Sequence, residues 1–276
     1  MTLTARAAVG QAAPRNAPRH RILIARVWPP LLVGVVLLGI WQLSTAFGLL
    51  SPATFSAPSQ VGVRIWGALG GAPMYDKSIW ENVAVTAQAV CVGYFFGAVA
   101  GVVIGYVLGR APFVAAVFQP YIRALAAVPK IALVPLLVLV FGIGVQAETA
   151  NVVLMVFIMV VFSTFSGVAG VRADFVNLAR IMGARKVTVA TRIVIPAALP
   201  AIMSGLRAGV PFAFIGAITS EFIASSSGLG WLMQRATAQY DPTGLFAALV
   251  YLVVLVWLFV QVIHAIERRV LRWQRR

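Results

Sequence analysis

Residues 171–200 read VRADFVNLARIMGARKVTVATRIVIPAALP and lie between two long apolar runs. The stretch is basic and has the spacing of short amphipathic helices, whereas each neighbouring run is apolar over about 20 residues, enough to cross a bilayer. The chain is therefore expected to leave the membrane here and to re-enter it from the same side. Some thirty amphipathic residues kept between two spans predict a contact with another molecule.

The composition of the whole chain agrees with this interpretation. Of 276 residues, 61% are hydrophobic and 11% are charged. A soluble domain has about half apolar and a quarter charged residues. Because the apolar residues come in long blocks and not in short alternating segments, the sequence predicts an all-α membrane protein and not a membrane barrel.

Six membrane-spanning helices are predicted within a single membrane domain, residues 27–276. An outward insert at 51–82, with a short helix expected at 61–69, follows the first span, and the basic residues 1–26 are expected to form a disordered inward tail. The predicted spans are 29–50, 83–109, 124–142, 150–170, 201–223 and 244–265.

The distribution of Lys and Arg predicts the orientation, because these residues are enriched in cytoplasmic segments. With six spans, the N-terminal tail, the segment between spans two and three, the 171–200 segment and the C-terminal tail share one side. They hold 18 of the 22 Lys and Arg residues, and the other side holds Arg64, Lys77 and Arg235. Both termini are therefore expected inside, and the net charge of +15 does not indicate a nucleic-acid partner.

Glycine recurs every fourth residue along the second span, at Gly93, Gly97, Gly101, Gly105 and Gly109. This spacing places the five residues on one ridge of a helix, where missing side chains allow another helix to come close. Packing within the chain is the favoured explanation, with a moving or dimerising interface as the alternative.

Several polar or kinked positions within the spans are candidates for a translocation path, since buried polar groups in a membrane turn toward protein or water. Lys130 and Arg207 can instead extend to the inner surface, and Glu221 has three possible roles: local pairing, capping the next turn, or gating an exit. The path candidates are Gln88, Pro135, Ser163, Thr164, Phe212, Thr219, Ser220 and Glu221.

The chain carries no recognisable catalytic constellation, neither a Ser/His/Asp set nor paired carboxylates, and no ligand-spaced metal site. A phosphate-binding loop needs a Gly directly before its Lys. The three lysines follow Asp76, Pro129 and Arg185. Any ATP-driven work would therefore come from another chain. A self-sufficient secondary transporter or channel is the alternative, but no repeat between the two halves supports it.

The 171–200 segment is expected to form two short helices, the first capped by Asp174 and ended at Gly183, and the second over 185–195. From its charge alone, it could equally rest on anionic headgroups or dock on a partner protein.

The segment resembles the coupling loop of ABC-importer permeases, whose consensus is Glu-Ala-Ala, three residues, Gly, nine residues, Ile-x-Leu-Pro. Ala179, Gly183, Ile193 and Pro196 match it, and Asn177 replaces the acid. Other matching motifs, in order, are Phe55-Ser56-Ala57-Pro58-Ser59, Val128-Pro129, Phe141-Gly142-Ile143-Gly144 and Ser226-Ser227-Gly228-Leu229-Gly230. Together they resemble the permease subfamily for nitrate, taurine and aliphatic sulfonates.

The resemblance implies a permease subunit of a bacterial plasma-membrane importer, itself not an enzyme and binding no cofactor. It would act as a homodimer with two ABC ATPase subunits, which bind ATP and Mg²⁺, and with an extracytoplasmic binding protein that delivers a small solute. The residues expected to couple this chain to the ATPase are Asp174, Asn177, Ala179, Arg180, Gly183, Ala184, Arg185, Ile193 and Pro196.

Overall fold

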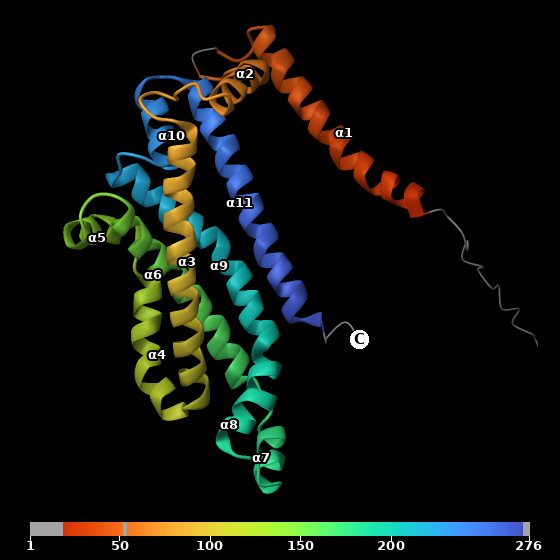
Figure 1. Cartoon of the computed structure of the whole chain (residues 1–276), viewed down its shortest axis with the longest axis vertical. Helices are drawn as coiled ribbons and strands as arrows, with labels where there is room; N and C mark the ends of the chain where they lie inside the picture. Colours follow the sequence, from red (N-terminus) through yellow and green to blue (C-terminus); the bar gives the residue numbers. More distant parts are fainter. Residues whose placement is uncertain (1–18, 52–53, 273–276) are drawn as a thin grey trace, which may run out of the picture. The chain divides into compact units, whose positions relative to one another are not determined.

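A computed structural model describes residues 19–51 and 54–272 of the protein (Figure 1). The described residues form helices and no strand; their one β-bridge is isolated, between Met74 and Lys77. The all-α prediction is therefore confirmed. The chain divides into two units, residues 1–59 and 60–276, which are described separately below.

The first unit contains α1 (Arg19–Ala46), of which the part from Trp28 is long and apolar enough to span a membrane. The helix starts within the segment predicted as a tail, of which residues 1–18 lie outside the described part. It ends before residue 50 because Gly48, with φ of +72°, adopts a conformation that favours glycine and stops helices.

The second unit holds the remaining helices. Four of them, α3, α6, the α8–α9 segment and α11, are candidate spans, and a bent pair, α4 with η1–α5, is a fifth in this unit if it crosses as one. Their bounds are α2 Pro58–Leu69, α3 Ile79–Arg110, α4 Pro112–Ala127, η1 Lys130–Leu133, α5 Val134–Phe141, α6 Val145–Ala169, α7 Ala173–Ile181, α8 Lys186–Val189, η2 Ala190–Val194, α9 Ile195–Ala224, α10 Leu229–Ala238 and α11 Pro242–Val270.

Helix α6 packs against both α3 and α9 to form the core of this unit. The glycine ridge of α3 faces α6: a Cβ at Gly97 would lie 2.7 Å from the Val153 carbonyl oxygen, and one at Gly101 2.8 Å from Val160 Cβ. The ridge therefore serves packing within the chain, as favoured above. On α9, Gly216 allows a similar close approach to α6, because a Cβ at this position would lie 3.3 Å from Val152 Cα.

The third span, predicted over 124–142, consists of a bent pair of helical segments, α4 with η1–α5. Helix α4 ends at Ala127, and the helical pair meets at an angle of 90°. Pro129 causes the break, because a proline disfavours helical geometry at the residue before it, and Val128 is extended with ψ of 131°. Lys130 Nζ then donates to the Ala126 carbonyl oxygen at 3.0 Å, so this lysine caps the broken end.

The two ends of the second unit carry different accessory helices (Figure 1). Helices α7 and α8 lie together at one end, and α10, which was not predicted, lies at the other near α2. At the α10 end, Asp241 caps α11 through Gly244 and accepts from the Tyr75 hydroxyl at 2.8 Å. Burial and this hydrogen bond raise the pKa of Tyr75.

Candidate functional site

The segment at 171–200 forms an anchored hairpin of short helices at the inward end. Val176 of α7 and Val189 of α8 are buried against Val168, Ala198 and Ile202 of α6 and α9. These contacts fix the hairpin to the spanning helices, so that a displacement of the hairpin would be transmitted to the bundle.

Gly183 determines the turn between the two short helices. Its φ is +80°, a region that residues with a Cβ rarely adopt. The Ala184 amide donates to the Ala179 carbonyl oxygen and the Gly183 amide donates to that of Arg180, both at 2.9 Å. These two bonds make a Schellman motif, the expected end of a helix at a glycine.

The second half of the hairpin differs from the expected single helix over 185–195. Helix α8 is only four residues long, and a π-helical turn, η2, joins it directly to α9. Thr191 Oγ1 donates to the Val187 carbonyl oxygen at 2.9 Å within this stretch. Pro196 is the second residue of α9, directly after this π-helical turn, and it supplies no N–H to the backbone hydrogen bonding there.

Asp174 was expected to cap α7, and this prediction is wrong. The N-cap position is Arg172, without a side-chain cap, and Asp174 lies inside the first turn. Its carboxylate instead accepts from the Arg172 guanidinium at 3.0 Å. Both side chains are more than two-thirds exposed, so the pair is weak and leaves Asp174 accessible.

The predicted coupling residues divide into two groups. Asp174, Asn177, Arg180 and Arg185 are exposed, whereas Ala179, Ala184, Ile193 and Pro196 are half-buried against the bundle. Beside the exposed polar residues lies an apolar surface that the motif comparison did not identify. It consists of Phe175, Leu178, Ile181, Met182 and Val187, which are 54–83% exposed.

A second polar network lies at the opposite end of the unit, around the start of α10. Asn82 Oδ1 accepts from the Gly228 amide at 2.8 Å, and Thr86 Oγ1 accepts from that of Leu229 at 2.9 Å. Glu221 accepts from the Gly230 amide and, at 2.6 Å, from the Thr86 hydroxyl. Three side chains thus satisfy three amides at the start of α10, which its own sequence leaves uncapped.

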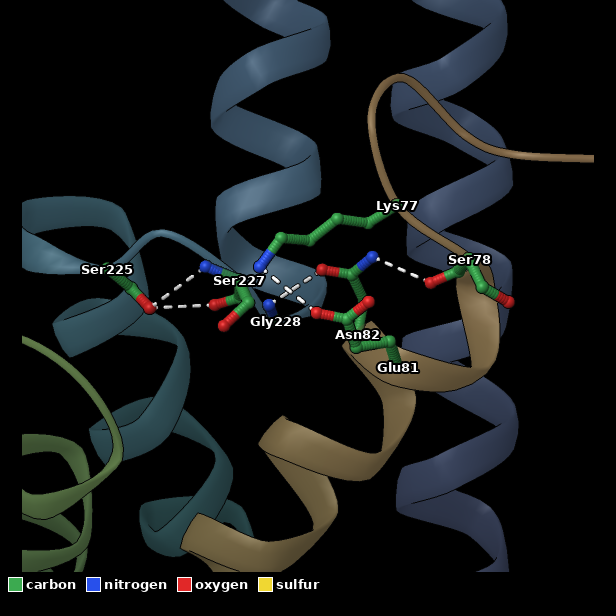
Figure 2. Close-up of polar contacts among 7 residues, drawn as sticks. All are labelled: Lys77, Ser78, Glu81, Asn82, Ser225, Ser227 and Gly228. Carbon is green, nitrogen blue, oxygen red and sulfur yellow. Dashed lines mark hydrogen bonds and ion pairs between the residues drawn. The ribbon is translucent and has the colours of Figure 1, made fainter.

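Figure 2 shows how α3 presents Asn82 to this network. The Asn82 side chain bridges the Gly228 amide and the Ser78 carbonyl oxygen, to which Nδ2 donates at 2.9 Å. Ser78 caps α3 by accepting from the Trp80 amide, and Lys77 pairs with Glu81 at 3.1 Å nearby. Of the three roles considered for Glu221, the structure shows the capping role.

Glu148 and Asn151 extend the polar network into α6 and were not singled out from the sequence. Asn151 Nδ2 donates to the Gly216 carbonyl oxygen at 2.9 Å and to Ser220 Oγ at 3.0 Å. Both Glu148 oxygens are buried and have no hydrogen-bond partner among the described residues. The Ser225 hydroxyl donates to the Ser227 carbonyl oxygen at 2.7 Å. The sequence did contain a signal for them: Glu148 and Asn151 are polar residues three apart in an otherwise apolar helix, a spacing that places both on one side of it.

The structure separates the predicted path residues. Thr164, Ser220 and Glu221 are fully buried within the chain, where Thr164 packs on Gly105 of the ridge. Such residues cannot line an open path in this conformation. The others are exposed or half-buried: Gln88, Pro135, Ser163, Phe212 and Thr219.

Ser163 borders a hollow of about 320 Å³ between α6 and α9. Its other lining residues are Phe162, Ser166, Ala201 and Ser204. Arg207, one turn further along α9, pairs with Glu267 in the last turn of α11 at 3.4 Å.

Comparison with known proteins defines the class to which this fold and hairpin belong. Residues 97–272 match the family of binding-protein-dependent transport system inner membrane components. The chain is 32% identical to a probable ABC transporter permease protein of Haemophilus influenzae, over 83% of this chain and 90% of that protein. It is 28% identical to the taurine transport system permease protein TauC of Escherichia coli, over 86% of each chain.

A solved structure of the MetNI methionine ABC transporter, in its inward-facing CY5 native crystal form, has the same fold. The TM-score is 0.60 at 19% identity, covering 70% of this chain and 97% of that one. The chain therefore belongs to the binding-protein-dependent transport system inner membrane component family. It is a multi-pass permease subunit of an ABC importer in the bacterial inner membrane, and not its ATPase.

Proposed function

We propose that two copies of this permease form the translocation path of an importer and that each α7–α8 hairpin docks on one ABC ATPase. The single observation that carries the docking proposal is that the hairpin has one side buried against the bundle and one side that is apolar but exposed. One side is anchored through Val176 and Val189, and the other exposes Ile181, Met182 and Val187. An exposed apolar patch on an anchored element is what a partner protein would cover.

Energy would enter through this contact. ATP and Mg²⁺ bound by the ATPase subunits would bring the two hairpins together, and hydrolysis would let them separate. The membrane unit would thereby alternate between outward-open and inward-open states, because each nucleotide state favours one arrangement. A binding protein would deliver the solute at the α10 end.

We propose a small anion as the solute, such as a sulfonate, taurine or nitrate. The support is the similarity to a taurine permease over 86% of each chain. A thermal-shift screen of the cognate binding protein against sulfonates, nitrate, aromatic acids and vitamin precursors tests the solute. Stabilisation only by compounds that carry no anionic oxygen group would contradict this proposal.

Gly183→Pro tests the docking hairpin. Proline fixes φ near −65°, so it cannot adopt the +80° found here, and the hairpin should lose its shape. In reconstituted vesicles with ATPase and binding protein, coupled ATP hydrolysis and uptake should disappear while membrane insertion persists. Gly183→Asn is the matched control, because Asn tolerates this backbone region and should keep most coupling. Normal coupled turnover of the proline variant would refute the proposal.

A further inference from the structure

The hollow between α6 and α9 is bordered by three serine hydroxyls within the spanning segments. Ser163 and Ser166 come from α6 and Ser204 from α9, and Phe162 and Ala201 complete the lining. Close packing of the two helices fixes the depth of these residues, because Gly205 lies directly against Ser163. The hollow is thus a built feature of the α6–α9 contact.

Ser166 and Ser204 are exposed and Ser163 is half-buried, and no side-chain hydrogen bond is formed by any of the three among the described residues. Hydroxyls in helices commonly satisfy themselves by donating to a carbonyl four residues earlier, as Thr191 and Thr237 do here. A hydroxyl left unpaired against hydrocarbon is unfavourable. Three such groups at one hollow therefore indicate that water or a polar solute occupies it.

The charges around the hollow indicate which solute it suits. None of its lining residues carries a carboxylate. Arg207 follows Ser204 by one turn of α9, is half exposed, and is held 3.4 Å from Glu267. Hydroxyl donors suit the oxygen atoms of an anion, and the absence of a full charge in the lining keeps the binding weak enough for release.

We propose that this hollow is a water-filled subsite of the translocation path that holds the anionic oxygen end of a small solute during its passage. The proposal deepens the proposed function and rests on it. It assigns Ser163, Ser166 and Ser204 a role in the path, of which the sequence indicated Ser163 alone.

Thiol modification tests the subsite without knowledge of the solute. Cys91 of α3 is exposed and is first replaced, Cys91→Ala. Ser204→Cys in this background then reports on the hollow. Val103→Cys is the matched control: Val103 is 56% exposed on α3, between the ridge positions Gly101 and Gly105, at the depth of Ser163.

The probes are two water-soluble methanethiosulfonates, one ending in a sulfonate and one in a trimethylammonium group, applied to the purified permease–ATPase complex. Ser204→Cys should react more than about tenfold faster than Val103→Cys, because a charged reagent enters hydrocarbon only at a high cost in free energy. Relative to their rates with a small thiol in solution, the sulfonate should be favoured over the cation at Ser204→Cys.

Equally slow reaction at the two positions would overturn the water-filled hollow, and a preference for the cation would overturn its anion selectivity. Co-purification of the ATPase and coupled hydrolysis are measured on the same preparations. If the complex assembles and hydrolyses ATP while Ser204→Cys stays unreactive, the subsite alone is refuted. If no ATPase binds the unmodified permease, the proposed function fails instead.

Discussion

At Gly97 the backbones of α3 and α6 approach closely enough that no side chain fits between them. The atoms that a Cβ would meet include the Val153 carbonyl oxygen at 2.7 Å and the Phe157 amide nitrogen at 3.2 Å. Backbone atoms cannot move aside as the end of a flexible side chain can. Even one methyl group must therefore separate the two helices.

Gly97→Ala should destabilise the permease by about 1–3 kcal/mol, the usual cost of overpacking a core. Thermal unfolding in detergent measures the effect. Gly62→Ala is the control, since Gly62 lies in helix α2 with no atom within 4 Å of the added methyl group. An unchanged melting temperature for Gly97→Ala would contradict the close approach of α3 and α6.

Thr86 is the second residue whose role depends on a single atom. Its hydroxyl donates to Glu221 and accepts from the Leu229 amide. Thr86→Val keeps the shape but leaves a buried amide and a buried carboxylate oxygen short of a partner. The loss should be about 1–3 kcal/mol of stability or more, since one of these groups can be charged. Thr86→Ser should recover most of it, and equal losses for the two variants would show that the hydroxyl is unimportant.

Among the helices, α7 has one buried side and one exposed side, and the proposal gives them separate roles. Val176 is 7% exposed and anchors α7 to the bundle, whereas Ile181 is 83% exposed. The two residues are five apart on the same short helix, so a pair of matched substitutions can separate anchoring from docking.

Ile181→Ser should leave the melting temperature of the isolated permease unchanged and weaken ATPase binding by more than about 1 kcal/mol, as expected for a central apolar contact. Val176→Ala should lower the stability of the permease by about 1–2 kcal/mol because it leaves a cavity. Pull-down titration and thermal unfolding provide the two measurements. The reverse pattern, or a stability loss in both variants, would mean that the exposed side is not the docking side.

The bend of the third span is a second feature that arises within individual helices. Val128 and Pro129 stop α4, and Lys130 caps the freed carbonyl end through Ala126. The sequence contained the proline, but prolines occur in straight and bent membrane helices alike. The angle of 90° follows from how both halves pack, which no local rule specifies.

For the molecule as a whole, the unequal distribution of basic residues predicts that both termini lie in the cytoplasm. A green fluorescent protein fused to the C-terminus should fluoresce, and alkaline phosphatase fused at the same point should be inactive. Fusions placed after Ala238, at the end of α10, should show the opposite behaviour. An active phosphatase at the C-terminus would reverse the orientation and would place the α7–α8 hairpin outside.

The sequence by itself determined the class of fold, and it predicted six crossings and a docking segment at 171–200. Each depends on a local property: the length of an apolar run, the side on which Lys and Arg gather, or the positive φ that Gly183 allows. The glycine ridge could also be predicted from a local property. Glycines at every fourth residue lie on one side of a helix, whichever helix that side packs against.

Tertiary structure alone decided which side chains meet. Glu221 caps α10 and Thr164 lies buried on Gly105, although both were plausible path residues in the sequence. Asn82, Thr86 and Glu221 come from two helices far apart in the chain, and the serines around the α6–α9 hollow do so as well. A polar residue in an apolar helix must find a partner, but the partner depends on helix rotation and packing distance, which side chains from the whole bundle set together.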